Sequence, residues 1–127
     1  AGAARLRAMG PAAPAAVASW ADRELWFPIF REARFVGATG AGDTTIAGFL
    51  AALLRGLDPV AAGRFANAVG ACNVEAADAL GGIRSWEATQ ARIAAGWETV
   101  PLAVAEPGWR RGPGGVWHGP ADREPGG

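Results

Sequence analysis

The sequence contains no lysine and only one cysteine, Cys72, among its 127 residues. A single cysteine excludes a disulfide within the chain as a source of stability. Neither sign of charge is in excess, because 12 arginines balance 12 acidic residues and the formal net charge is +0. The chain therefore lacks the basic surface typical of proteins that bind nucleic acid or an anionic membrane. Its longest strongly apolar run, residues 46–54, is far shorter than the ~20 residues that span a bilayer.

Half of the residues are hydrophobic, and the length is compatible with one domain. Residues 1–105 are expected to form the folded part. Residues 106–127 are dominated by glycine and proline, a composition that favours a disordered tail. His118 lies in this segment without a set of partner residues, and we assign it no role. Cys72 falls on the apolar face of a predicted helix, and we expect it to be a core residue.

The most informative segment is a glycine-rich turn, residues 37–43 (GATGAGD), which leads directly into an apolar-periodic helix. Glycines allow backbone N–H groups to converge on an anion without obstruction by Cβ atoms. The start of the helix adds unpaired N–H groups and the positive end of the helix dipole. Asp43 would repel a bound anion, so its place at this junction indicates that it accepts a proton there. Residues 34–36 form a strand candidate before the turn, and this order is typical of α/β phosphate sites.

Three helices are predicted from the turn onward. Apolar residues at helical spacing predict the first helix over residues 44–57. A second helix is expected over residues 59–74, with Asp58 as its N-cap and Pro59 as its first residue. A third helix, over residues 85–95, opens on a serine N-cap. The predicted architecture is therefore of the α/β class, with the glycine turn as its candidate site.

Residues 40–43 (GAGD) and 47–49 (AGF) resemble the second signature of the PfkB, or ribokinase-like, carbohydrate kinases. The resemblance covers roughly residues 20–100. It implies a ribokinase-like three-layer α/β/α architecture, of which residues 1–105 would supply only the C-terminal part. It also implies a cytoplasmic enzyme. Family members carry most of the sheet, the sugar pocket and a lid in an N-terminal half that this sequence does not contain.

The resemblance implies ATP-dependent phosphorylation of a sugar hydroxyl. Asp43 would be the catalytic base that takes the hydroxyl proton. Four backbone N–H groups would form the anion hole for the transferring phosphoryl group, namely those of Gly40, Ala41, Gly42 and Asp43. Gly40, Gly42 and Asn67 would contact the nucleotide, with Asn67 beside the adenine. The implied cofactors are ATP and Mg²⁺, with most Mg²⁺ ligands outside this chain. The implied substrate is a sugar or sugar-like molecule, which the sequence does not identify.

Several of these positions have alternative interpretations. Asp43 alone fits an ordinary N-cap, and Asn67 fits a polar residue on a solvated helix face. Gly37 stands where many family members have an aspartate that helps to hold a monovalent cation. Because glycine has no side-chain oxygen, activation by such a cation is in doubt. Glu75 and Asp78 share a helix face, but two carboxylates spaced in this way favour a solvated face, and we assign no metal ligand.

Two other functions stay open. Residues 35–40 also resemble the start of a dinucleotide-binding Rossmann fingerprint. That fingerprint requires glycine at position 43, where the carboxylate of Asp43 would repel the pyrophosphate, so an NAD(P)-dependent oxidoreductase is the weaker alternative. The other alternative is a non-catalytic fragment. Without the rest of a sheet, the apolar face of the 44–57 helix has little to pack on, and we expect the isolated chain to have weak or no kinase activity.

Overall fold

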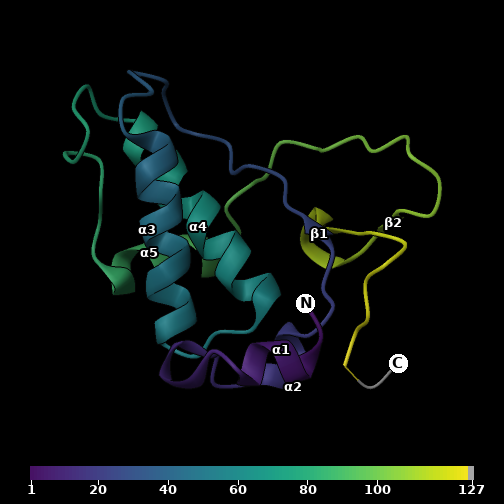
Figure 1. Cartoon of the computed structure of the whole chain (residues 1–127). Helices are drawn as coiled ribbons and strands as arrows, with labels where there is room; N and C mark the ends of the chain where they lie inside the picture. The colour runs from purple at the N-terminus through teal and green to yellow at the C-terminus, as the bar shows by residue number, and fades with distance from the viewer. Residues whose placement is uncertain (126–127) are drawn as a thin grey trace.

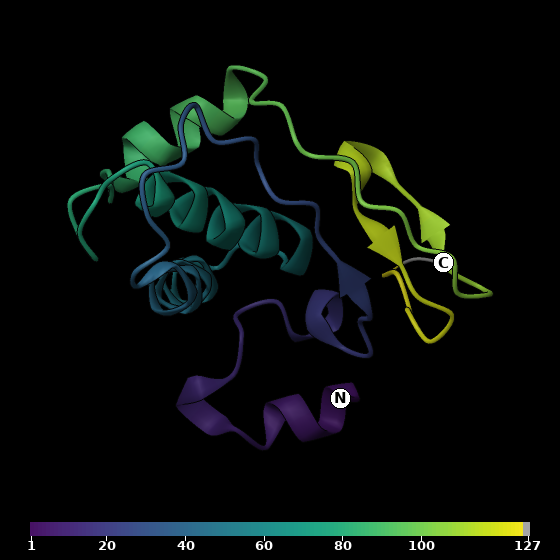
Figure 2. The same ribbon diagram turned by 90° about the horizontal axis from the view of Figure 1, so that it is seen from above.

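The computed structural model describes residues 1–125 of the chain. The elements in chain order are α1 (Ala3–Arg7), η1 (Gly10–Ala12), α2 (Val17–Trp20), β1 (Leu25–Trp26), α3 (Ala41–Leu54), α4 (Pro59–Val74), α5 (Trp86–Ala94), β2 (Arg110–Arg111), η2 (Pro113–Gly115) and β3 (Trp117–His118). α4 lies between α3 and α5, and the strands form a small sheet beside this group (Figures 1 and 2). No described helix is both long and apolar enough to cross a membrane.

The second and third predicted helices begin at the predicted caps. At the start of α4, the Asp58 carboxylate accepts the N–H of Ala61 at 2.9 Å, and Pro59 is the first helical residue. At the start of α5, the Ser85 hydroxyl accepts the N–H of Ala88 at 3.1 Å. Each cap satisfies a donor that would otherwise have no partner within its helix. These two boundaries were therefore encoded locally, and both predictions are confirmed.

The first predicted helix starts earlier than expected, and the strand predicted before it is wrong. α3 begins at Ala41 because Gly40 takes a φ of 75° and turns the chain there. Residues 34–36 pair with no strand among the described residues. The backbone N–H of Val36 instead donates to the carbonyl of Val74 at 2.8 Å, at the C-terminal end of α4. The segment is thus held by a helix end rather than by a sheet.

α3 and α4 pack closely because glycines lie at their contact. A Cβ atom on Gly48 would lie 2.9 Å from Val69 Cγ2 and 3.3 Å from Ala66 Cα. A Cβ atom on Gly70 of α4 would collide with the hydroxyl oxygen of Thr45 on α3. Only glycine allows the two backbones to approach this far. Gly70 therefore serves the close packing of the two helices.

Aromatic pairs attach α5 to α4, and the chain after α5 to the segment after β1. Phe65 of α4 packs on Trp86 of α5 with ring centroids 4.1 Å apart. Phe30, in the segment after β1, stacks on Trp97 at 4.7 Å. Such pairs add about 0.5–1.5 kcal/mol each beyond their buried area. Cys72 is 1% exposed, which confirms its prediction as a core residue.

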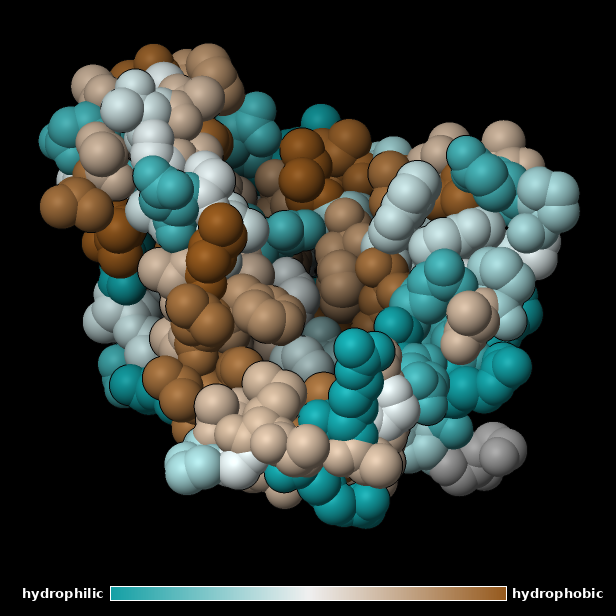
Figure 3. Space-filling view, viewed as in Figure 1, coloured by the Kyte–Doolittle hydropathy of each residue, from teal (hydrophilic) through white to brown (hydrophobic). Residues whose placement is uncertain are grey.

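One apolar stripe of α3 remains uncovered. Ile46, Leu50 and Leu54 follow one another at intervals of four residues and are 61%, 49% and 84% exposed. Apolar residues gather over this helix in the space-filling view (Figure 3). Phe49 and Leu57 turn the other way and pack on the core. The single stripe predicted for this helix is therefore divided between a core side and an open side, as expected of a helix with too little to pack on.

The strands form one antiparallel sheet in the order β1-β3-β2, with Trp26 and Arg111 both opposite Trp117. The predicted three-layer architecture requires a parallel sheet between helical layers. The described residues do not show that arrangement, because their only sheet is small and antiparallel.

The segment after residue 105 differs from the disordered tail predicted from its composition. It contributes β2, η2 and β3, and Val116 within it is 0% exposed. The indole N–H of Trp117 donates to the carbonyl of Leu102 at 2.9 Å. Contacts with β1 and with preceding loops order this segment, and glycine and proline counts do not register such contacts. Residues 126 and 127 of the predicted tail lie outside the described residues.

Candidate active site

Asp43 lies in the first turn of α3, on the outside of the molecule. It is the third residue of the helix, whose N-cap position is held by Gly40, and no side chain caps this helix. The alternative that Asp43 is an ordinary N-cap is therefore wrong. The residue is exposed, and no described residue forms a hydrogen bond or an ion pair with its carboxylate. The carboxylate is thus open to an approaching molecule at the start of α3.

The backbone around Asp43 presents unpaired donors. The N–H of Ala41 already donates to the carbonyl of Ala38 at 3.1 Å, and so it is the one donor of the predicted anion hole that is engaged. The N–H groups of Gly40, Gly42 and Asp43 have no acceptor among the described residues. A Cβ atom on Gly42 would have no neighbour within 4 Å, so no other part of the described chain covers this residue on that side. Unpaired donors at the start of a helix are one requirement for an anion site.

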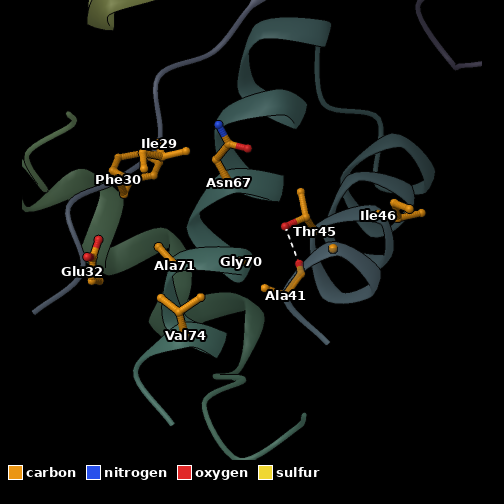
Figure 4. A pocket seen from close by; sticks show the side chains of 11 residues that line it. Ile29, Phe30, Glu32, Ala41, Thr45, Ile46, Asn67, Gly70, Ala71 and Val74 are labelled. Carbon is orange, nitrogen blue, oxygen red and sulfur yellow. Dashed lines mark hydrogen bonds between the residues drawn. The ribbon is translucent and has the colours of Figure 1, made fainter. Parts of the chain in front are cut away.

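A hollow of about 500 Å³ lies beside this turn, between α3, α4 and the segment after β1. Its size falls within the range of small-molecule sites, and apolar atoms dominate its walls. Figure 4 shows α3 on one side of the hollow, α4 at its base and the segment after β1 on the other side. The residues drawn from these three elements include Ala41, Thr45 and Ile46, then Asn67, Gly70, Ala71 and Val74, and finally Ile29, Phe30 and Glu32.

Asn67 is half-buried and lines this hollow, so its alternative interpretation as a residue on a solvated helix face is wrong. Its side-chain nitrogen donates to the carbonyl of Pro28 at 3.0 Å and lies 3.5 Å from that of Phe27. Asn67 thereby holds the segment after β1 against α4. The amide oxygen is the atom that stays available to a ligand.

Gly37 lies over the chain that follows α4. A Cβ atom at this position would lie 3.7 Å from the carbonyl oxygen of Ala77 and 3.8 Å from that of Ala76. Gly40, at the helix start, lies similarly close to the carbonyl oxygen of Ala79. Backbone oxygens therefore gather beside the glycine turn, while the side-chain oxygen that an aspartate at position 37 would add is missing.

Glu75 is not on a solvated face, and this prediction is wrong. The residue is 8% exposed at the end of α4. Its two oxygens accept hydrogen bonds from the Arg92 guanidinium at 2.7 and 2.9 Å, and one also accepts the N–H of Ala33 at 2.7 Å. The hydrogen bond from Arg92 lowers the pKa of the Glu75 carboxyl, against the effect of burial, which raises it. Since Arg92 is 17 positions away, no local pattern could have revealed the pair.

Asp78 is exposed and belongs to the turn that follows α4. Its carboxylate accepts the N–H of Leu80 at 2.9 Å and also the N–H of Gly81. These backbone hydrogen bonds lower the pKa of Asp78. Glu75 and Asp78 thus serve different contacts, and they do not converge as a metal pair.

Comparisons with known proteins give one positive result. A family model described as pfkB family carbohydrate kinase matches residues 10–85, which is more than half of the chain. The matched part includes the glycine turn, Asp43 and Asn67. No curated protein and no solved structure matches the chain. The match implies a ribokinase-like fold and a general carbohydrate kinase activity, and the chain belongs to the PfkB family of carbohydrate kinases.

Proposed function

We propose that this protein acts in the ATP-dependent phosphorylation of a sugar hydroxyl, with Asp43 as the catalytic base. The observation that carries the proposal is the exposed carboxylate of Asp43, which lacks a partner among the described residues and lies beside unpaired N–H groups in the first turn of α3. A sugar hydroxyl loses its proton as it attacks phosphorus, and a carboxylate within hydrogen-bond reach can take it. The same turn would bring the base and the phosphoryl-binding donors together.

The anion hole would use three of its four predicted donors. The N–H groups of Gly40, Gly42 and Asp43 are available to the equatorial oxygens of the transferring phosphoryl group, whereas that of Ala41 is engaged with Ala38. Donors that are fixed before the reaction stabilise the developing charge without a cost of reorganisation. The helix dipole adds to this stabilisation at the same end of α3.

The hollow beside the turn would take the adenine of ATP. Its mainly apolar walls suit a flat aromatic base, and Asn67 is a polar residue that could orient it. Because the amide nitrogen of Asn67 is bound to Pro28, its oxygen would accept the amino group of adenine. The glycine turn has no second carboxylate, so it does not form a Mg²⁺ site by itself. Mg²⁺, when bound with ATP, neutralises the phosphate oxygens.

The Rossmann alternative is less well supported. A Rossmann site follows a buried parallel strand, and residues 34–36 form no strand. The alternative of a non-catalytic fragment concerns this chain in isolation, and the uncovered stripe of Ile46, Leu50 and Leu54 supports it. We therefore propose that the chain, tested alone, has weak or no kinase activity.

The test is ADP release in the presence of a panel of sugars. It compares the chain alone with the chain carrying any native sequence that precedes it in its gene, each as wild type, Asp43→Asn and Asp58→Asn. Asp58→Asn is the matched control, because asparagine caps a helix as well as aspartate does. Loss of sugar-dependent ADP release only in Asp43→Asn, with ATP binding retained, supports the assignment. A protein that ignores ATP and every sugar but binds NAD(P) would overturn it.

A further inference from the structure

The C-terminal segment brings one histidine and two carboxylates to a single point. The Nδ1 atom of His118 lies 2.8 Å from Oδ2 of Asp122 and 2.9 Å from Oε1 of Glu124. The three atoms lie within 4.8 Å of one another. His118 and Asp122 are each 7% exposed, whereas the side chain of Glu124 is 49% exposed. The inner part of the cluster, His118 and Asp122, is therefore buried, and its Glu124 side is open to solvent.

Hydrogen bonding alone explains only part of this arrangement. A ring nitrogen carries at most one proton, and that proton can point well at only one of the two carboxylates. The other carboxylate oxygen then faces the same nitrogen at 2.8–2.9 Å without a proton of its own. A divalent cation in front of Nδ1 would instead bond to all three atoms at once.

The spacing suits such an ion. Two ligand atoms that each lie about 2.1 Å from one cation are about 3.0 Å apart at a right angle and about 3.4 Å apart at a tetrahedral angle. The two contacts of Nδ1, at 2.8 and 2.9 Å, are close to the right-angle value, and they would have to lengthen by about half an ångström to reach the tetrahedral value. An imidazole nitrogen with two carboxylate oxygens is a donor set suited to Zn²⁺ or Mn²⁺. Water would complete the coordination from the exposed side.

Neighbouring groups hold these ligands in place. Oδ1 of Asp122 accepts hydrogen bonds from Nε of Arg23 at 2.7 Å and from the N–H of Glu24 at 2.9 Å. Arg23 also donates to Oδ2 at 3.2 Å, so that oxygen would be shared with the cation. A Cβ atom on Gly112 would lie 2.7 Å from Nε2 of His118, so the backbone closes the other edge of the ring. Partners of this kind orient ligating side chains before the metal binds.

We propose that His118, Asp122 and Glu124 form a binding site for one divalent transition-metal ion, for which Zn²⁺ is the probe. The ion joins the end of β3 to the turn that follows it, and through Arg23 it reinforces the contact with β1. Small domains with limited cores are often stabilised in this way. The site lies outside the matched residues 10–85 and does not depend on the proposed kinase function.

The sequence makes the proposal unusually easy to test, because it contains a single histidine and a single cysteine. The cysteine is buried. The experiment is a Zn²⁺ titration of the full chain with any purification tag removed, at neutral pH. Binding is measured by calorimetry and by the imidazole NMR signals of His118. The variants are Glu124→Gln, His118→Gln and the control Glu106→Gln, which replaces an exposed acid outside the cluster.

We expect one Zn²⁺ per chain, a change in the imidazole signals at one equivalent, and a melting temperature that rises with Zn²⁺ concentration. Glu124→Gln should weaken binding at least tenfold, and Glu106→Gln should leave it unchanged. Because Glu124 is half exposed, its variant tests the site even if His118→Gln fails to fold. Absence of stoichiometric binding, or equal binding by Glu124→Gln and wild type, would show that the cluster is held by hydrogen bonds alone.

Discussion

The Glu75 carboxylate of α4 receives two hydrogen bonds from the Arg92 guanidinium of α5, at 2.7 and 2.9 Å. The same carboxylate accepts the N–H of Ala33, in the segment that leads to the glycine turn. The Arg92 guanidinium also lies 3.6 Å from the centroid of the Trp97 ring. One ion pair therefore ties the end of α4 to α5 and to the approach to Asp43. This relationship makes Glu75 a key residue for stability, although it takes no part in the proposed chemistry.

Replacement of Glu75 by glutamine should lower the free energy of unfolding by about 2 kcal/mol, because a charge-assisted pair is lost and the Arg92 guanidinium is left without its partner. Urea denaturation followed by tryptophan fluorescence measures this change. Glu98→Gln is the matched control, because its side chain is 73% exposed and its contact with Arg31 is 3.4 Å long. Its cost should stay below about 1 kcal/mol. Equal costs for the two variants would contradict the assigned role of Glu75.

The same ion pair predicts a pH dependence of stability. The hydrogen bond from Arg92 holds the pKa of Glu75 below its usual value of 4.5 in the folded chain. The stabilisation is therefore fully present above pH 4.5 and is lost as the pH falls through the folded-state pKa. Unfolding curves between pH 7 and pH 3 should show wild type and Glu75→Gln converging below pH 4.5. A difference between them that stays constant over this range would refute the linkage.

Gly48→Ala should destabilise the helix pair by about 1 kcal/mol. Alanine is the better helix former by about 1 kcal/mol, but its Cβ atom would lie 2.9 Å from Val69 Cγ2 and 3.3 Å from Ala66 Cα. Overpacking of this kind costs about 1–3 kcal/mol. Thermal unfolding should show a smaller effect of Gly48→Ala in a Val69→Ala background, because the 2.9 Å contact with Cγ2 is then removed, although the Cβ atom of residue 69, at 3.0 Å, remains. Additive effects of the two substitutions would mean that this contact does not limit the packing.

Gly40→Ala should cost more stability than Gly10→Ala. Both residues have a positive φ, of 75° and 60°, which costs a non-glycine residue about 1–2 kcal/mol. The Cβ atom of Gly40→Ala would also lie 3.0 Å from Ala79 Cβ and 3.2 Å from its carbonyl oxygen, whereas that of Gly10→Ala meets nothing within 4 Å. The difference between their melting temperatures measures the collision separately from the backbone strain. Equal melting temperatures would argue against the close approach of Ala79.

Gly37→Asp should introduce a response to K⁺ in the form of the protein that shows kinase activity. The new carboxylate would join the carbonyl oxygens of Ala76 and Ala77, from which the Cβ atom lies 3.8 and 3.7 Å away. Hard cations bind such sets of oxygen ligands. Sugar-dependent ADP release would be compared in K⁺ and in Li⁺, with Gly37→Asn as a control of similar size and no charge. Identical rates in both salts would show that the position does not determine cation dependence.

The sequence by itself determined the local features of this protein. Asp58 and Ser85 fixed the starts of α4 and α5. The side-chain oxygen of each cap accepts the free backbone N–H of the residue three positions later, and this hydrogen bond does not depend on the rest of the fold. The glycine turn and its Asp43 indicated the family, since this pattern is short and contiguous, and the family match includes it.

Only the tertiary structure decided which side chains meet across the chain. The spacing of Glu75 and Asp78 predicted that both carboxylates face solvent, but Glu75 is buried and paired with Arg92. His118 meets Asp122 and Glu124, only four and six positions further along, because the turn after β3 brings their carboxylates to its ring, and the sequence spacing did not indicate that turn. Distant or neighbouring segments also decided two other outcomes. Residues 34–36 bond to the end of α4 instead of forming a strand, and the segment after residue 105 is ordered by its contacts with β1 and preceding loops. Propensity and composition record local preferences of the chain, whereas burial and pairing depend on what the rest of the fold brings alongside.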